Sequence, residues 1–342
     1  QPDNEGVGDR HDQARHKAVT AEEDLFAILE ALDATVWKGL GINHLMVEEW
    51  LSGFGAECAP GCDGRIQALY LLSRFTYFGQ TEVRALAAAL HRDCFRYPAV
   101  AEIRRANEHT LEQVRLQELF EQRLHETRFL GMGNPSESGT HLLYHYRQES
   151  ELNSRLFISA HEMFDLTADE PRLADPTVRR YVFIDDFCGS GVQASRYSRS
   201  VLERLSKAAM AAGVDAIAEY HVLVGTAKGL REVRENTGFR SVRCVLELDE
   251  TFQAFGTSSR YFEDVQAPLG REDARDLALR HGLELLPRNP LGFDEAELLL
   301  GFAHNTPNNT LPIFWHPGTA QKPWSAPFRR YGKNTRRIER VA

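Results

Sequence analysis

The stretch of sequence that decides the fold is Tyr181-Val-Phe-Ile-Asp-Asp-Phe-Cys-Gly-Ser-Gly-Val-Gln-Ala194. Four mostly apolar residues run into two carboxylates, Asp185 and Asp186, and a turn of small residues leads into a helical pattern that ends near Ala212. This succession predicts a buried strand, a tight loop and a helix N-terminus. Backbone N–H groups in such a loop, together with the positive end of the helix dipole, favour an anion, usually a phosphate. Carboxylates beside that anion site suit sugar hydroxyls, so the stretch predicts a sugar-phosphate site.

Strands and helices alternate on both sides of this stretch. The predicted strands cover residues 156–159, 181–184, 220–224, 241–248 and 298–303, and short helices are predicted over 141–147 and 227–235. Such alternation is typical of an α/β fold, in which helices flank a parallel sheet. Ligands of these folds bind at the carboxyl ends of the strands, which is where the loop after residue 186 lies.

The first part of the chain has a different pattern. Residues 1–20 contain few apolar side chains and predict disorder, whereas residues 21–128 are helical in pattern and predict an N-terminal α-helical domain. Within it, 66–78 reads as one buried helix and 99–128 as one long amphipathic helix. The α/β domain is then predicted over 129–342.

Composition limits the possible classes of protein. The chain of 342 residues carries a formal net charge of −9, which argues against a uniformly basic nucleic-acid binder. No apolar run approaches the length of a membrane span, and the polar N-terminal region lacks a signal-peptide core, so a cytoplasmic location without membrane contact is expected. An odd count of five cysteines suits reduced thiols. The basic segment 329–340 either contacts nucleic acid or an acidic partner, or is simply solvated.

The signature stretch resembles that of the phosphoribosyltransferases. In that family the acidic pair, here Asp185 and Asp186, holds the ribose hydroxyls of phosphoribosyl pyrophosphate. The loop that wraps the 5′-phosphate then corresponds to Cys188, Gly189, Ser190, Gly191, Val192 and Gln193. Gly189 replaces a usual Thr or Ser, and Gln193 replaces the usual closing Thr. The alternative is an ordinary strand–loop–helix turn that needs glycine only for its backbone geometry.

Two further segments, 65–80 and 304–315, resemble the phosphoribosyltransferase-like proteins of bacterial conflict systems. Some of those proteins accompany retron or other anti-phage loci, and the resemblance covers about residues 24–330. It implies an effector of phage defence. Its partners would be phosphoribosyl pyrophosphate or a nucleotide, a protein encoded in the same defence operon, and possible retron components, namely a reverse transcriptase or its nucleic acid.

The resemblance also implies a pyrophosphate loop and a lid. Ser136, Ser138 and Gly139 would hold pyrophosphate or its magnesium water, and the polar loop 161–176 would close over the site. Mg²⁺ is the implied cofactor, although no side chain is assigned to it directly. The alternative for 131–139 is a plain Pro/Gly/Ser connection.

A base-binding segment is expected after the strand predicted over 298–303. Phe314 or Trp315 would stack on the base. The side chains expected to hydrogen-bond the edge of the base are His304, Asn305, Asn308 and Asn309. Arg260 and Tyr261 follow the strand 241–248 and either face the same site or are a surface Arg and a half-buried Tyr. The alternative is an Asn/Pro turn whose side chains bond their own backbone.

Two functions remain open from the sequence. The first is an enzyme that makes or breaks an N-glycosidic bond at a ribose 5-phosphate, acting on a nucleobase, a nucleotide or nucleic acid. The second is a non-catalytic sensor that binds a phosphoribosyl ligand or nucleotide and signals to a partner protein.

Overall fold

The computed structural model describes residues 5–38, 40–58, 63–133, 138–165, 167 and 171–331. The chain divides into two compact units. The first joins residues 1–80 to residues 250–342, and the second comprises residues 81–249. The predicted boundary between 128 and 129 therefore lies inside the second unit, and the last part of the chain belongs with the first.

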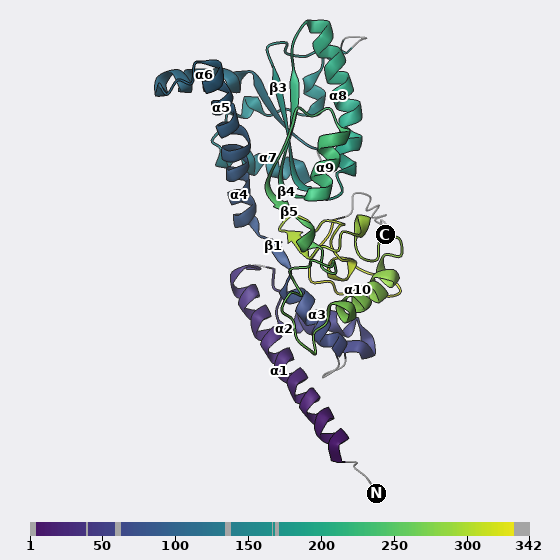
Figure 1. Ribbon diagram of the computed structural model, residues 1–342. Coiled ribbons are helices and arrows are strands. Elements are labelled where there is room, and N and C mark those ends of the chain that lie inside the picture. Colours follow the sequence, from purple (N-terminus) through teal and green to yellow (C-terminus); the bar gives the residue numbers. More distant parts are fainter. Residues whose placement is uncertain are drawn as a thin grey trace, which may run out of the picture. The chain divides into compact units, whose positions relative to one another are not determined.

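A four-stranded parallel sheet forms the centre of the second unit (Figure 1). Its strands, in spatial order, are β2 (Thr127–Gly131), β3 (Arg180–Cys188), β4 (Ile217–Thr226) and β5 (Ser241–Leu248). Asp185 lies opposite Val222, and Phe187 lies opposite Val224. Because all four strands are parallel, their carboxyl ends meet at one edge. The predicted α/β fold with a parallel sheet flanked by helices is confirmed.

Helices cover both faces of this sheet. The helical elements of the second unit, apart from two 3₁₀ turns, are α4 (Gln80–Ala89), the π-helical segment η2 (Leu90–Arg96), α5 (Tyr97–Ala106), α6 (Gln113–His125), α7 (Ser138–Glu149), α8 (Val192–Ala212) and α9 (Ala227–Asn236). On one face, Phe183 and Tyr220 pack with Leu205 of α8 in a common core. On the other face, Phe129 contacts Phe95 of η2 and Tyr146 of α7. Covering on both faces explains why β3 begins with a nearly continuous apolar run.

The first unit is mainly helical and carries a small second sheet. Its elements are α1 (Glu5–Thr35), α2 (His44–Ser52), η1 (Gly55–Cys58), α3 (Asp63–Ser73), β1 (Thr76–Phe78), η5 (Glu250–Phe252), α10 (Arg271–Leu285), η6 (Phe293–Glu295), β6 (Leu300–Phe302) and η7 (Pro312–Phe314). The indole of Trp50 stacks on Phe314 with ring centroids 5.5 Å apart and donates a hydrogen bond to the Ile313 carbonyl. Both rings are fully buried, so segments from the two ends of the chain share one core.

Several predicted elements differ from the structure. The helix predicted over 66–78 ends at Ser73, because Thr76–Phe78 pairs as a strand with Leu300–Phe302. The helix predicted over 99–128 is interrupted after Ala106, where Glu108 and His109 both have positive φ and cannot continue a right-handed helix. No Gly or Pro announces this break in the sequence.

Three other predictions concern irregular segments. Helix α1 begins at Glu5, within the stretch 1–20 for which the sequence predicts disorder. The predicted strand over 156–159 is reduced to one bridge, Phe157 with Phe129, after the 3₁₀ turn η3 (Ser154–Leu156). The predicted lid contains the 3₁₀ turn η4 (Ala160–Met163) and a bridge from Phe164 to Leu173. Residues 166, 168–170 and 332–342, with most of the basic tail, lie outside the described residues.

Candidate functional site

The acidic pair lies inside β3 near its carboxyl end, because the strand continues to Cys188, beyond the end predicted at residue 184. Asp185 and Asp186 point to opposite faces of the sheet, as successive strand residues do. The Asp185 carboxylate accepts hydrogen bonds from the Tyr220 hydroxyl at 2.7 Å and from its neighbour's backbone N–H at 3.0 Å. The Asp186 carboxylate accepts one from the backbone N–H of Phe187 at 2.9 Å. Tyr220 thus fixes the orientation of Asp185.

Burial changes the pKa of Asp185. Asp185 keeps some exposure, but its carboxyl lies against the fully buried ring of Tyr220. Desolvation raises the pKa of Asp185 well above its ordinary value, and the neighbouring charge of Asp186 raises it further. The Tyr220 hydroxyl partly opposes this shift by donating its hydrogen bond. A carboxyl of this kind accepts hydrogen bonds when ionised and donates one when protonated, and both suit a sugar hydroxyl.

The loop after β3 packs closely against the first turn of α9. Gly191 has φ +74°, and a Cβ built there would lie 2.5 Å from the Gly229 carbonyl oxygen. A Cβ on Gly229 would in turn overlap the Gly189 carbonyl. Thr226 completes the contact, since its hydroxyl donates to the Gly189 carbonyl at 2.5 Å and accepts from the Gly229 N–H at 2.9 Å. Only glycine at 191 and 229 permits this approach.

Helix α8 begins directly after this loop, at Val192. The first N–H groups of a 21-residue helix therefore face the carboxyl edge of the sheet, beside the acidic pair. The side chains of Val192 and Gln193 are exposed, whereas the Cys188 thiol is buried in the core and burial raises its pKa to about 12. Any phosphate contact of Cys188 would thus use its backbone, and the loop can bind an anion through main-chain groups.

The structure only partly describes the expected pyrophosphate loop. Ser136 lies outside the described residues, and Ser138 and Gly139 form the first turn of α7 rather than a loop. They follow β2, which neighbours β3 in the sheet, so this helix start belongs to the same edge as the acidic pair.

The expected base-binding segment belongs to the other compact unit. It follows β6, which pairs with β1 and not with the four-stranded sheet. Asn305 accepts hydrogen bonds from the backbone N–H groups of Thr306 and Tyr331, both at 3.0 Å, and Asn309 donates to the Phe293 carbonyl at 3.0 Å. The contact with Thr306 is the local kind that the alternative interpretation expects, whereas Tyr331 and Phe293 lie 26 and 16 residues away in sequence.

The other side chains expected near the base, namely Phe314, Trp315, Arg260 and Tyr261, contact residues of the first unit. The ring of Phe314 is buried in the core of the first unit, so stacking on a base is ruled out for it. Trp315 donates from its indole to the Thr310 carbonyl. Arg260 lies over the ring of Phe252, and the Tyr261 carbonyl accepts a hydrogen bond from Tyr70. His304 stacks beside Phe302, and no hydrogen bond involving the side chain of Asn308 is described.

A comparison with family models matches residues 47–330 to PRTase-CE. The chain belongs to the PRTase-CE family. The match spans both compact units, which supports the resemblance to phosphoribosyltransferase-like proteins drawn from the acidic pair and its loop. A comparison with curated proteins gave no match. None of the helices described is long and apolar enough to cross a membrane.

Sequence reasoning missed two supports of the acidic pair and its loop. Tyr220 was read as part of an apolar strand, although a tyrosine opposite an acidic strand residue is a possible hydrogen-bond donor. Thr226 lies between the strand predicted over 220–224 and the helix predicted over 227–235, and Gly229 lies within that helix. The Thr-x-x-Gly spacing, in which Thr caps the helix, was the available signal.

Proposed function

We propose that this phosphoribosyltransferase-like protein makes or breaks an N-glycosidic bond at a ribose 5-phosphate. One observation carries the proposal: Asp185 and Asp186 lie near the carboxyl end of a central parallel strand, and the loop that follows leads through the left-handed Gly191 into the N-terminus of α8. This arrangement combines acceptors for sugar hydroxyls with donors for a phosphate. The acceptor would be a nucleobase, a nucleotide or nucleic acid.

In this mechanism the chain mainly positions its substrate. The loop 188–193 binds the 5′-phosphate through N–H groups, and the two carboxylates orient the ribose hydroxyls. Tyr220 keeps the Asp185 carboxyl from rotating away. The bond from the anomeric carbon to pyrophosphate breaks as the bond to an acceptor nitrogen forms. Positive charge develops on the sugar ring between these events, and the nearby carboxylates stabilise it.

Mg²⁺ fits this site as an ion that arrives with the pyrophosphate. Within the described parts of the chain, no three His, Cys, Asp or Glu side chains form a group able to hold a metal ion. Magnesium usually keeps several waters and takes one or two carboxylates besides substrate phosphates, which Asp185 and Asp186 could supply. Bound there, it would neutralise charge on the leaving pyrophosphate.

The test is release of pyrophosphate from phosphoribosyl pyrophosphate by the full chain with Mg²⁺, with and without nucleobases, nucleotides or nucleic acid. The double variant Asp185→Asn/Asp186→Asn is the inactive comparison, and Glu203→Gln on the exposed face of α8 is the matched control. Turnover that is equal in wild type and double variant would contradict the assignment.

A second candidate, binding without catalysis, is favoured by one feature of the loop. Position 189 is glycine, and its carbonyl is held by Thr226, so a hydroxyl ligand common in active phosphoribosyltransferases is missing. A sensor would bind ribose 5-phosphate and fail to release pyrophosphate under every acceptor condition, which separates it from the enzyme.

We also propose that the protein acts in anti-phage defence with a partner encoded beside it. The resemblance of segments 65–80 and 304–315 to proteins of bacterial conflict systems supports this role. Phage plating on cells that carry the native locus tests it. The Asp185→Asn/Asp186→Asn locus should lose protection, and co-purification from the same cells would identify a partner protein or a retron nucleic acid. Equal plating with and without the locus would refute the role.

A further inference from the structure

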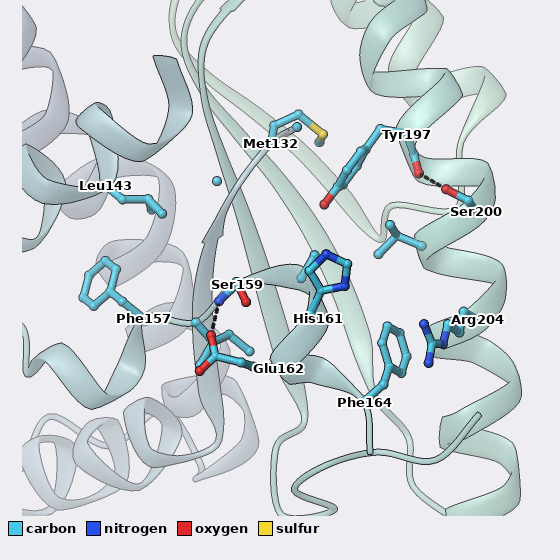
Figure 2. Close-up of a pocket in the computed structure, with 15 residues that line it drawn as sticks. Met132, Leu143, Phe157, Ser159, His161, Glu162, Phe164, Tyr197, Ser200 and Arg204 are labelled. Carbon is cyan, nitrogen blue, oxygen red and sulfur yellow. Dashed lines mark hydrogen bonds between the residues drawn. The ribbon is translucent and has the colours of Figure 1, made fainter. Parts of the chain in front are cut away.

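A cavity of about 530 Å³ lies at the carboxyl end of the edge strand β2 in the second unit (Figure 2). Its walls come from the end of β2, from α7, from the segment 157–164 and from α8. Small-molecule sites usually measure about 300–1,000 Å³. The cavity is therefore large enough for a ligand with one or two rings. Three of its lining residues, His161, Glu162 and Phe164, belong to the segment 161–176 that the resemblance implies as a lid.

The cavity is lined mainly by apolar and aromatic groups. Phe157, Phe164 and Tyr197 contribute rings, and Met132 contributes a thioether. Figure 2 shows the hydroxyl end of Tyr197 directed into the space between Met132 and His161. Aromatic rings and a polarisable sulfur favour a flat ring over an aliphatic chain, because flat rings stack and pack edge to face.

One cation in this cavity, Arg204, has no anionic partner in the part of the chain that the structure describes. The Arg204 guanidinium is half-buried and lies 4.2 Å from the ring centroid of Phe164. Among the described residues, no carboxylate pairs with it. Glu162, on the opposite side of the cavity in Figure 2, instead accepts a hydrogen bond from the Ser159 N–H at 2.7 Å. A guanidinium held flat on a ring keeps its donors free to bind a carboxylate or phosphate in bidentate fashion.

Arg204 and Tyr197 lie at different positions along the axis of α8. Arg204 follows Tyr197 by seven residues, which is about 10 Å along a helix axis. The Tyr197 end borders β3, since this ring packs on Phe183 and Met132 donates its backbone N–H to the Ile184 carbonyl at 2.8 Å. A ligand in the cavity would thus place its ring near β3, the strand that carries the acidic pair. The charged group of the ligand would lie further from β3, beside Arg204.

We propose that this cavity binds an aromatic compound that carries one anionic group. The ring packs among Met132, Phe157 and Tyr197, and the carboxylate or phosphate is bound by Arg204. A heteroaromatic carboxylate and a nucleoside monophosphate share this chemistry. The site is separate from the loop 188–193, so it does not depend on the phosphoribosyl assignment.

Titration calorimetry on the full chain tests the site with charged and neutral pairs of probes. Nicotinate against nicotinamide and orotate against uracil test the carboxylate, and AMP against adenosine and UMP against uridine test the phosphate. Saturating ribose 5-phosphate is present throughout, so that the loop 188–193 is filled. We expect at least one charged probe to bind about tenfold or more tightly than its neutral partner, since hydrogen bonds to charged groups are worth about 1.5–3 kcal/mol.

Two variants and one control assign that binding to the cavity. Arg204→Gln should weaken the charged probe about tenfold, and Ser200→Phe, which adds bulk from an exposed position, should abolish binding. Arg199→Gln, an exposed position of the same helix outside the cavity, should leave it unchanged. The proposal is overturned if no probe binds, if charged and neutral probes bind equally, or if Arg204→Gln binds as tightly as Arg199→Gln. Failure of ribose 5-phosphate to bind would count only against the proposed function.

Discussion

Gly191→Ala is the substitution whose effect the structure allows us to work out most fully. The backbone there has φ +74°, where an L-residue costs about 1–2 kcal/mol. The new Cβ would also lie 2.5 Å from the Gly229 carbonyl oxygen and 2.9 Å from the Glu232 Cβ. Overpacking of this kind costs about 1–3 kcal/mol more. We therefore expect the free energy of unfolding to fall by about 2–5 kcal/mol.

Gly213→Ala is the matched control, because it separates strain from overlap. Gly213 ends the same helix with φ +66°, and nothing lies within 4 Å of a Cβ built there. It should cost only the strain, about 1–2 kcal/mol. Urea unfolding followed by circular dichroism measures both variants. Tryptophan fluorescence would not serve, since Trp37, Trp50, Trp315 and Trp324 all belong to the first unit.

Ligand binding gives a second measurement on the same pair. If the loop moves to relieve the overlap, its N–H groups lose their alignment, and ribose 5-phosphate should bind about tenfold more weakly to Gly191→Ala. Gly213→Ala should bind it normally. The reasoning is refuted if the two variants unfold within about 0.5 kcal/mol of each other and bind ribose 5-phosphate equally.

Three further predictions concern the charged groups of the second unit. Asp185→Asn/Asp186→Asn should abolish ribose 5-phosphate binding in calorimetry while circular dichroism stays unchanged; normal binding would remove the pair from the site. The raised folded pKa of Asp185 means that its contribution to stability is complete below its unfolded pKa of about 3.9 and is lost as pH rises through the folded value. Asp185→Asn should thus gain stability relative to wild type from pH 4 to pH 7 in urea unfolding, whereas parallel pH curves would argue against a raised pKa. Glu219→Ala leaves the buried Arg180 with Glu102 alone and should cost about 3 kcal/mol of unfolding free energy. Glu203→Ala removes an exposed pair with Lys207 and should leave the unfolding free energy nearly unchanged; similar losses in the two variants would contradict a buried ion pair.

Local patterns predicted the second half of the parallel sheet well. The helix expected to end at Ala212 does so, and the strand expected over 241–248 has those bounds. These elements are long and periodic, and they are bounded by glycines or caps, so short-range propensity and tertiary packing agree. Local patterns did not predict where the helices in 66–78 and 99–128 end. Their helical pattern continues through Thr76–Phe78 and through Asn107, and only pairing with β6 or two left-handed residues stops it.

The sequence by itself determined the strand–loop–helix of 181–212, the adjacent carboxylates and the run of small residues in the loop, because each depends on neighbours along the chain. Only the tertiary structure decided what surrounds them. Tyr220 reaches Asp185 and Gly229 supports Gly191 because parallel strands bring residues dozens of positions apart into register. Long-range packing likewise turned Asn305 and Asn309 to the backbone of distant segments and placed Arg204 in a cavity where no carboxylate of the described residues pairs with it. Such outcomes depend on which surfaces bury one another, and no local pattern encodes that choice.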